Sequence, residues 1–166
     1  MPGSIKQVML AGLRVAVFAF VLAGCGSGPS GPALTFDPCE PVVIAAPSVT
    51  ADQRAGITDA IALWSAAGVT TLSIGDAPQV TVEYKAGASI EYGFYDDTTA
   101  TVYVNTEVTD AAQRAIVVAH ELGHALGLVH VPAATRPSVM NPGNLTVAPT
   151  ADDVAALAAI WGSCPP

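Results

Sequence analysis

The chain has 166 residues, a length that fits one domain with a sizeable hydrophobic core. Apolar residues make up 51% of it and charged residues only 12%, which excludes an intrinsically disordered chain. Its 14 acidic residues against 6 basic ones give a formal charge of −8, and this balance argues against a nucleic-acid partner, which needs a basic surface.

The first 24 residues predict a signal peptide. Lys6 and Arg14 precede an apolar run, residues 15–23, that is too short to span a bilayer. The run ends in Leu-Ala-Gly-Cys, and this ending resembles the box at which bacterial lipoproteins are cleaved and then lipidated on the cysteine, here Cys25. An ordinary secretory signal with a chance cysteine is the alternative. The resemblance implies an exported protein that a lipid on Cys25 anchors to a membrane, with the outer membrane or the cell surface favoured.

Residues 25–38 are rich in Gly, Ser and Pro and predict a flexible tether, which leaves 39–166 as the folded domain. The signal peptide carries two of the six basic residues, so its removal changes the formal charge to −10. Cys39 and Cys164 stand at the two ends of the predicted domain, and an oxidising compartment favours a disulfide between them. Two alternatives stay open, namely Cys39 as a thiol that coordinates an active-site metal, and two free thiols.

The domain begins with a short apolar run at 41–44, which is typical of a strand. Thr50 and Gln53 have the spacing of a capping box, so a helix is expected to follow Thr50. Apolar residues recur along it at helical spacing, and Gly68 is a natural end for it.

Residues 69–108 have the composition of β-structure. Runs of β-branched and aromatic residues at 80–84 and 101–104 predict strands, with interruptions at Gly93 and at the Asp-Asp pair 96–97. The chain between them is expected to turn rather than to form a regular element.

Two further helices are predicted in the second half. Asp110 and Gln113 begin a helix that continues to about Leu126. Thr150 begins a third helix that ends at Gly162. One face of this last helix is apolar, and its members are Val154, Leu157, Ala158 and Trp161. The predicted order of elements is a helix, several strands, a second helix, an irregular segment and a third helix. This order indicates an α+β domain.

Every histidine of the chain lies in the segment His-Glu-Leu-Gly-His-Ala-Leu-Gly-Leu-Val-His at 120–130. His120 and His124 are one helical turn apart, so their side chains share a helix face and can chelate one metal ion. Gly127 allows the helix to stop and the chain to turn, which brings His130 back as a third ligand. Three imidazoles and an open fourth position are typical of a catalytic zinc site. The spacing therefore predicts one catalytic Zn²⁺ ion.

Glu121 follows the first ligand and is offset from it around the helix. There it can reach the zinc-bound water without binding the metal. Zinc lowers the pKa of bound water from 15.7 to about 7. Glu121 can then take a proton from this water and pass it to the leaving amine. The alternative is a helix whose histidines are satisfied structurally, but three buried histidines without a shared partner would be costly.

The extended motif resembles that of the metzincin zinc peptidases. The resemblance implies a turn with a methionine beneath the metal, and Met140 stands ten residues after His130, where this turn belongs. In the family the methionine packs under the ligands without binding the metal. The implied fold is a zincin-like single domain of the α+β class. Its expected parts are a mixed twisted sheet, a first helix, an active-site helix, the methionine turn and a C-terminal helix.

Within that group, the zinc helix and the end of the chain are similar to the matrixins. The end combines the pair Asp152 and Asp153 with an apolar helix that finishes in Trp161 and Gly162. The resemblance implies that Asp153 supports the methionine turn. It also implies that Asp152 meets a freed N-terminal amine, a role that a lipidated N-terminus does not fit. The alternative is that both acids favour the positive end of a helix, by about 0.3–1 kcal/mol each.

The chain departs from the matrixins in its metal complement and its latency device. It has no Pro-Arg-Cys-Gly latency motif, and no histidine remains for a structural zinc. Asp76, Asp96 and Asp97 are candidate calcium ligands, but no EF-hand-like loop is present. We therefore expect these three acids to be turn residues on the surface.

The sequence thus predicts a zinc metalloendopeptidase, a monomer, that hydrolyses peptide bonds outside the cytoplasm. The resemblance implies that a peptide or protein substrate binds as an added strand along a sheet edge within residues 88–105, with 101–105 as the candidate edge. It also implies a specificity pocket between the zinc helix and residues 144–148.

Two other functions compete with this one. The first is a zinc-bearing surface binding lipoprotein with little or no turnover. Glu121 argues against it, because a binding protein needs no general base. The second is a purely structural lipoprotein, which would hold no metal.

Overall fold

The computed structural model describes residues 36–37, 39–87 and 92–162. In chain order these ranges form β1 (Val42–Ala45), α1 (Ala51–Ala67), β2 (Leu72–Ile74), β3 (Val80–Lys85), β4 (Gly93–Asp96), β5 (Thr101–Asn105), α2 (Ala111–Ala125) and α3 (Ala151–Trp161). The predicted α+β domain with three helices is confirmed. The predicted signal peptide, Cys25 and Cys164 lie outside the described residues, so the predictions about them stay predictions.

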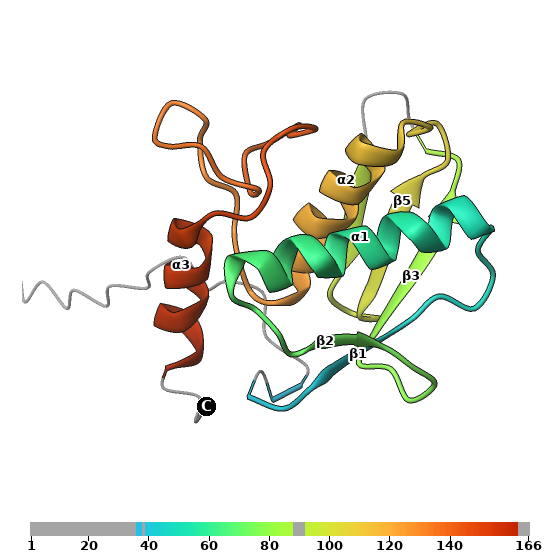
Figure 1. Cartoon of the computed structure of the whole chain (residues 1–166), viewed down its shortest axis with the longest axis horizontal. Coiled ribbons are helices and arrows are strands. Elements are labelled where there is room, and N and C mark those ends of the chain that lie inside the picture. Colours follow the sequence, from blue (N-terminus) through green and yellow to red (C-terminus); the bar gives the residue numbers. More distant parts are fainter. Residues whose placement is uncertain (1–35, 38, 88–91, 163–166) are drawn as a thin grey trace, which may run out of the picture.

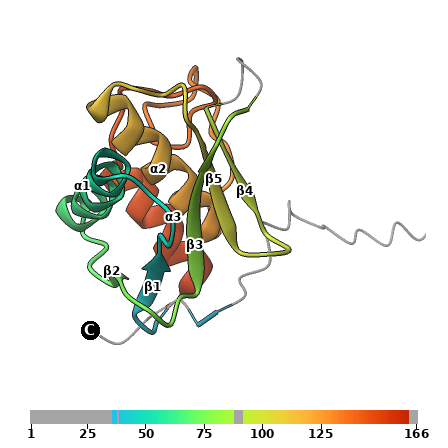
Figure 2. The same cartoon turned by 90° about the vertical axis from the view of Figure 1, so that its right-hand side faces the viewer.

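The strands form one mixed sheet in the order β2-β1-β3-β5-β4. All neighbouring pairs are parallel except β4 with β5, which are antiparallel. Helices α1 and α2 lie on the same side of the sheet, as Figures 1 and 2 show from two directions. Strand β4, which is antiparallel to its neighbour β5, forms one edge of the sheet.

The assignment of residues 101–105 to the sheet edge was wrong. Strand β5 pairs with β3 on one side and with β4 on the other, so it is an interior strand. Gly93 and Asp96, which were expected to interrupt the β-structure, are instead the first and last residues of the edge strand. The tertiary pairing with β5 overrides the weak strand propensity of Gly and Asp.

The first helix begins and ends as its sequence predicts. The Thr50 hydroxyl accepts a hydrogen bond from the Gln53 amide at 3.2 Å, and the Gln53 side chain accepts one from the Thr50 amide at 2.9 Å. At the other end, Gly68 adopts φ of +115°, a left-handed conformation that favours glycine. The helix is therefore fixed at both ends by local interactions.

The core lies between the sheet and the pair α1 and α2. The sheet contributes valines such as Val82 and Val102, and α1 contributes Trp64, and all three are fully buried. The indole Nε1 of Trp64 donates a 3.0 Å hydrogen bond to the Ala119 carbonyl of α2. Phe36, in the last part of the predicted tether, is half-buried against the same core. This packing fixes the position of α2, which carries His120 and His124.

Helix α3 packs against the end of α2. Leu157 is 1% exposed, and the Trp161 indole donates a 2.9 Å hydrogen bond to the Leu126 carbonyl. Ala158 was expected on the buried face but is exposed. Among the residues described, none of the helices has the length and apolar character that crossing a bilayer requires.

Candidate active site

Helix α2 presents two histidines on one face. The rings of His120 and His124 have their centroids 4.9 Å apart. Backbone carbonyls orient both rings: Nδ1 of His120 is 2.7 Å from the Val139 oxygen, and Nδ1 of His124 is 2.9 Å from the Leu128 oxygen. An imidazole that donates from Nδ1 has its lone pair on Nε2. Both rings therefore turn an acceptor nitrogen toward the same space.

The third histidine reaches this space because the chain reverses after α2. Gly127 has φ of +101°, and its amide donates a 2.9 Å hydrogen bond to the His124 carbonyl. A left-handed residue at this point ends the helix sharply. The Nε2 atom of His130 then lies 3.1 Å from that of His120 and 3.2 Å from that of His124.

The three histidines fit a zinc ion. Their ligand atoms all lie within 4.8 Å of one another, and they form the only such group of three or more potential ligands among the described residues. Burial lowers the pKa of His120 to about 4 and also lowers that of His124, so both rings are neutral near pH 7. Neutral imidazole is the form that binds metals. Lone pairs that converge in this way repel one another unless a cation lies between them.

Glu121 lies beside the histidines with 6% of its surface exposed. Burial raises the pKa of Glu121 to about 8, and a hydrogen bond from the backbone of Tyr95 opposes part of that rise. A Cβ added at Gly93 on the edge strand would lie 2.8 Å from Glu121 Oε1. The carboxyl group is therefore enclosed between α2 and β4.

Two adjoining cavities open at this site. One, of about 170 Å³, is lined by His120, Glu121, His130 and residues 142–144. The other, of about 410 Å³, shares Glu121 and His130 and extends along the edge strand to Phe94. A polypeptide that follows the edge strand would therefore pass directly over Glu121.

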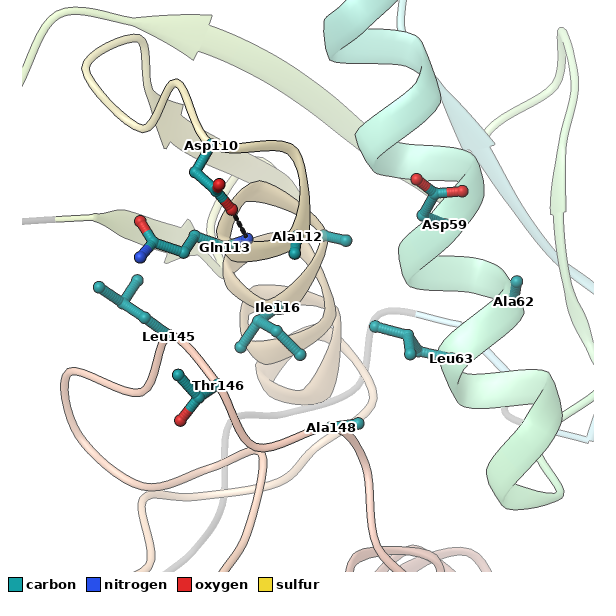
Figure 3. Close-up of a pocket in the computed structure, with 11 residues that line it drawn as sticks. Asp59, Ala62, Leu63, Asp110, Ala112, Gln113, Ile116, Leu145, Thr146 and Ala148 are labelled. Atoms are coloured by element: carbon teal, nitrogen blue, oxygen red, sulfur yellow. Dashed lines mark hydrogen bonds between the residues drawn. The ribbon is translucent and has the colours of Figure 1, made fainter.

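Residues 144–148 were predicted to form one wall of the specificity pocket, and this prediction is correct only for the first of them. Asn144 lines the 170 Å³ cavity, together with residues 142–143. Leu145, Thr146 and Ala148 instead line a separate groove between α1 and α2 (Figure 3). The wall is displaced because the chain bends at Asn144, whose side-chain oxygen accepts hydrogen bonds from the Thr146 and Val147 amides.

The methionine turn lies beneath the three histidines. Met140 is 1% exposed, and its sulfur occupies the space that a side chain at Gly123 of α2 would need. The Met140 amide donates to the Ser138 hydroxyl at 2.9 Å, and the Met140 carbonyl accepts from the Val131 amide at 2.9 Å. The turn is thus tied to the segment that carries His130.

Asp153 at the start of α3 is the anchor of this turn. Its side chain is fully buried and accepts hydrogen bonds from the Ser138 hydroxyl at 2.5 Å and from the Val139 amide at 3.1 Å. Arg136 forms an ion pair with it at 2.8 Å. Burial alone would raise the pKa of Asp153, but the hydrogen bonds from Ser138, Thr150, Arg136 and Val139 together lower it below 3.8. The expected neighbour Asp152 is exposed.

Two functional residues, Arg136 and Ser138, were missed in the sequence, and a third, Asn144, was predicted only as part of the wall of the specificity pocket. Ser138 and Arg136 contact Asp153, and Asn144 donates a 3.1 Å hydrogen bond to the Val139 carbonyl, which also accepts from His120. A dense run of Ser, Asn, Pro and Gly at 137–144 is a turn signal, but it does not indicate which carbonyl each side chain meets.

None of the other candidate ligands that the structure describes joins the group of three histidines. Asp96 acts as a turn residue, since its carboxylate accepts hydrogen bonds from the Thr98 amide at 3.0 Å and hydroxyl at 2.6 Å. The hydrogen bond from the Thr98 side chain lowers the pKa of Asp96. Asp97 lines the larger cavity. The disulfide of Cys39 with Cys164 stays a prediction, because Cys164 lies outside the described residues.

Comparisons with known proteins agree with this geometry. The sequence profile of the family described as Matrixin matches residues 79–162, which are 84 of the 166 residues. A crystal structure of myroilysin is similar to this chain, with a TM-score of 0.59 and 16% identity, and the match covers 82% of this chain and 87% of that one. A second structure of myroilysin has a TM-score of 0.57 at 16% identity, over 75% and 80% of the two chains. No curated protein sequence matches the chain.

Proposed function

Because the chain belongs to the matrixin family of zinc metallopeptidases, we propose that it is an endopeptidase in which Glu121 is the general base and acid. The observation that carries this proposal is the position of Glu121. It lies in the same cavity as His120 and His130 and is nearly enclosed there. A protein that only bound zinc would have no use for a buried carboxyl group at this point.

The three histidines would hold the metal through Nε2, in the orientation that the Val139 and Leu128 carbonyls impose. Zinc held there would supply a Lewis acid that makes water acidic enough to lose a proton near neutral pH. Glu121 accepts that proton while the water oxygen attacks the carbonyl carbon of the scissile peptide bond. The same carboxyl group then donates the proton to the amine nitrogen as the carbon–nitrogen bond breaks. A pKa near the working pH suits a group that both accepts and donates a proton.

We propose that the substrate is an extended polypeptide that adds to the edge strand β4. This strand pairs only on the β5 side among the described residues, so its other backbone edge is available for pairing. Phe94 on this strand is 55% exposed and Tyr92 beside it is 38% exposed, although both are apolar. Exposed aromatic residues along an open edge are suited to contact substrate side chains.

We also propose that the protein acts outside the cytoplasm as a lipid-anchored monomer. The support for export and anchoring is the predicted signal peptide over residues 1–24, with Cys25 directly after it. A cell that expresses the wild-type chain and is grown with labelled palmitate should incorporate the label, and the Cys25→Ser variant should not. Label in both variants would exclude Cys25 as the lipidated residue.

The experiment that tests the enzymatic proposal compares the wild type with Glu121→Gln. Both proteins should bind about one zinc ion, and only the wild type should cleave a diverse peptide library. A chelator added to the wild type should abolish cleavage. Equal cleavage by both proteins would exclude Glu121 as the base. Full zinc occupancy without cleavage of any peptide would favour a zinc-bearing binding protein instead.

A further inference from the structure

A further cavity of the described chain lies away from the histidines. It is a groove of about 780 Å³ between α1, α2 and residues 145–148. Figure 3 shows its lining, with Leu63 on α1, Ile116 on α2 and Leu145 on the irregular segment. This volume is within the range of sites that bind ligands of substantial size.

The groove combines an apolar floor with an acidic rim. Leu63, Ile116 and Leu145 are all partly or fully buried. Asp59 and Asp110 are exposed at the rim, and the lining contains no lysine or arginine. Within the described part of the chain neither carboxylate is in an ion pair, and the Asp110 carboxylate, the N-cap of α2, accepts a 2.9 Å hydrogen bond from the Gln113 amide (Figure 3). A ligand that fits this groove would therefore be apolar and carry a positive charge.

The groove and the active-site cavity share one wall. Asn144 lines the cavity, whereas its neighbour Leu145 lines the groove. The same division occurs on α2, where Val117 lines the cavity and Ile116 the groove. The cavity and the groove therefore lie on the two sides of one wall, and each further residue of an extended polypeptide spans about 3.3 Å. A polypeptide of ordinary length that is bound at the histidines can therefore also reach the groove.

From this charge complementarity and shared wall we propose that the groove is a second binding site for the protein substrate. It takes an apolar segment that carries lysine or arginine and lies away from the scissile bond. This proposal rests on the proposed endopeptidase function, because it assigns the occupant to the substrate of that same site. Such a site increases the effective concentration of the substrate at the active site without a new contact to the scissile bond.

The first test places a large cation in the groove. Ala62 of α1 is exposed and lines the groove, whereas Ala55 of α1 is exposed and does not line it. Ala62→Arg should lower kcat/KM about tenfold for denatured casein. The same variant should leave unchanged the kcat/KM for the shortest casein peptide that contains the cleaved bond. Ala55→Arg, the matched control, should behave as the wild type on both substrates.

The second test measures binding without turnover. Isotopically labelled Glu121→Gln protein is titrated with a synthetic peptide of alternating leucine and lysine, and then with the same peptide carrying glutamate in place of lysine. The lysine peptide should shift the NMR signals of Ala62 and Leu145, and it should bind at least fivefold more tightly than the glutamate peptide. Asp59→Asn should reduce that ratio, whereas Asp52→Asn, an exposed change on α1 outside the groove, should not.

The experimental results would distinguish a failure of the groove proposal from a failure of the endopeptidase proposal. If the chain is no peptidase, the wild type cleaves neither casein nor its short peptide. If only the groove proposal is wrong, the wild type cleaves both, and Ala62→Arg matches Ala55→Arg on casein. If both peptides shift the NMR signal of Ala62 equally, the ligand needs no positive charge, and this part of the proposal is overturned. Shifts that depend on protein concentration alone would assign the groove to a second copy of this chain and overturn the proposal.

Discussion

The Asp153 carboxylate accepts a 2.5 Å hydrogen bond from the Ser138 hydroxyl, and this contact ties α3 to the methionine turn. The other carboxylate oxygen accepts from the Val139 amide at 3.1 Å. The carbonyl of the same Val139 residue orients His120. The last helix of the domain is thereby connected to a metal ligand through a single buried residue.

The first prediction concerns the removal of this carboxylate charge. Asp153→Asn replaces one accepting oxygen with an amide that donates, so the Val139 and Thr150 amides lose their acceptor. Leaving a buried donor without its acceptor costs roughly 1–3 kcal/mol of the free energy of unfolding. Urea unfolding of the two proteins measures this loss. Asp152→Asn, the exposed neighbour, should change stability by less than about 0.5 kcal/mol.

The second prediction is the pH dependence that Asp153 imposes. Its pKa is lowered in the folded protein, so the unfolded chain binds a proton more readily than the folded one. This contribution to stability is fully present above the unfolded pKa, about 3.9, and is lost as the pH falls through the lower folded value. Urea unfolding between pH 2.5 and 6, with chelator present throughout, should show this loss. Asp153→Asn should have a smaller slope below about pH 4, whereas Asp152→Asn should keep the wild-type slope.

The sequence predicted the features that depend on local spacing. The capping box at Thr50, the helix that carries His120 and His124, and the glycine turn at Gly127 all follow from contacts within a few residues. Such patterns can be read from one chain because their partners are neighbours in it.

Features that depend on distant partners were harder to predict. The edge strand that begins at Gly93 exists because β5 pairs with it, and no local propensity indicates that pairing. Arg136 and Ser138 become important only because α3 brings Asp153 to them. Hydrogen-bond partners more than ten residues apart are chosen by the fold rather than by spacing.

The third prediction concerns the contact of Gly93 with Glu121. A Cβ at position 93 would lie 2.8 Å from Glu121 Cγ and Oε1, and 2.9 Å from Val117 Cγ1. Gly93→Ala must therefore displace the carboxyl group. A misplacement of about 1 Å can lower the rate roughly 100-fold, so kcat on a peptide substrate should fall by that order. Bound zinc should be unchanged, because the atoms nearest to the added Cβ belong to Glu121 and Val117 and not to a histidine. Gly87→Ala, whose Cβ would meet the Asn105 side chain alone among the described residues, should keep the wild-type rate.

The fourth prediction concerns the contact of Gly123 with Met140. The Met140 sulfur fills the space above Gly123, and Trp64 lies 3.3 Å from the position of the missing Cβ. Gly123→Ala should destabilise the fold by about 1–3 kcal/mol, because an added methyl group overpacks the core. It should also weaken zinc binding in a chelator competition assay, because the methionine turn shifts under His120. In the double variant with Met140→Ala, the two losses should be less than additive, since the smaller side chain leaves room. Strict additivity would show that the two residues are not in contact.

The fifth prediction concerns Asn144, which joins the wall of the active-site cavity to a metal ligand. Its amide nitrogen donates to the Val139 carbonyl at 3.1 Å and to the Val147 carbonyl at 2.7 Å, and its oxygen accepts from the amides of residues 146 and 147. Asn144→Ala removes all four hydrogen bonds and leaves the wall without its internal support. Because Asn144 also lines the 170 Å³ cavity, the loss should change which side chain is preferred beside the scissile bond. In a peptide-library digest, the variant should therefore accept a wider range of side chains at that position.

Thr146→Ala, which keeps the Asn144 hydrogen bonds because they use only the backbone of Thr146, should retain the wild-type preference. An unchanged preference in Asn144→Ala would place the specificity of the enzyme on the edge strand instead, where Phe94 is the most exposed of the large apolar side chains that the structure describes.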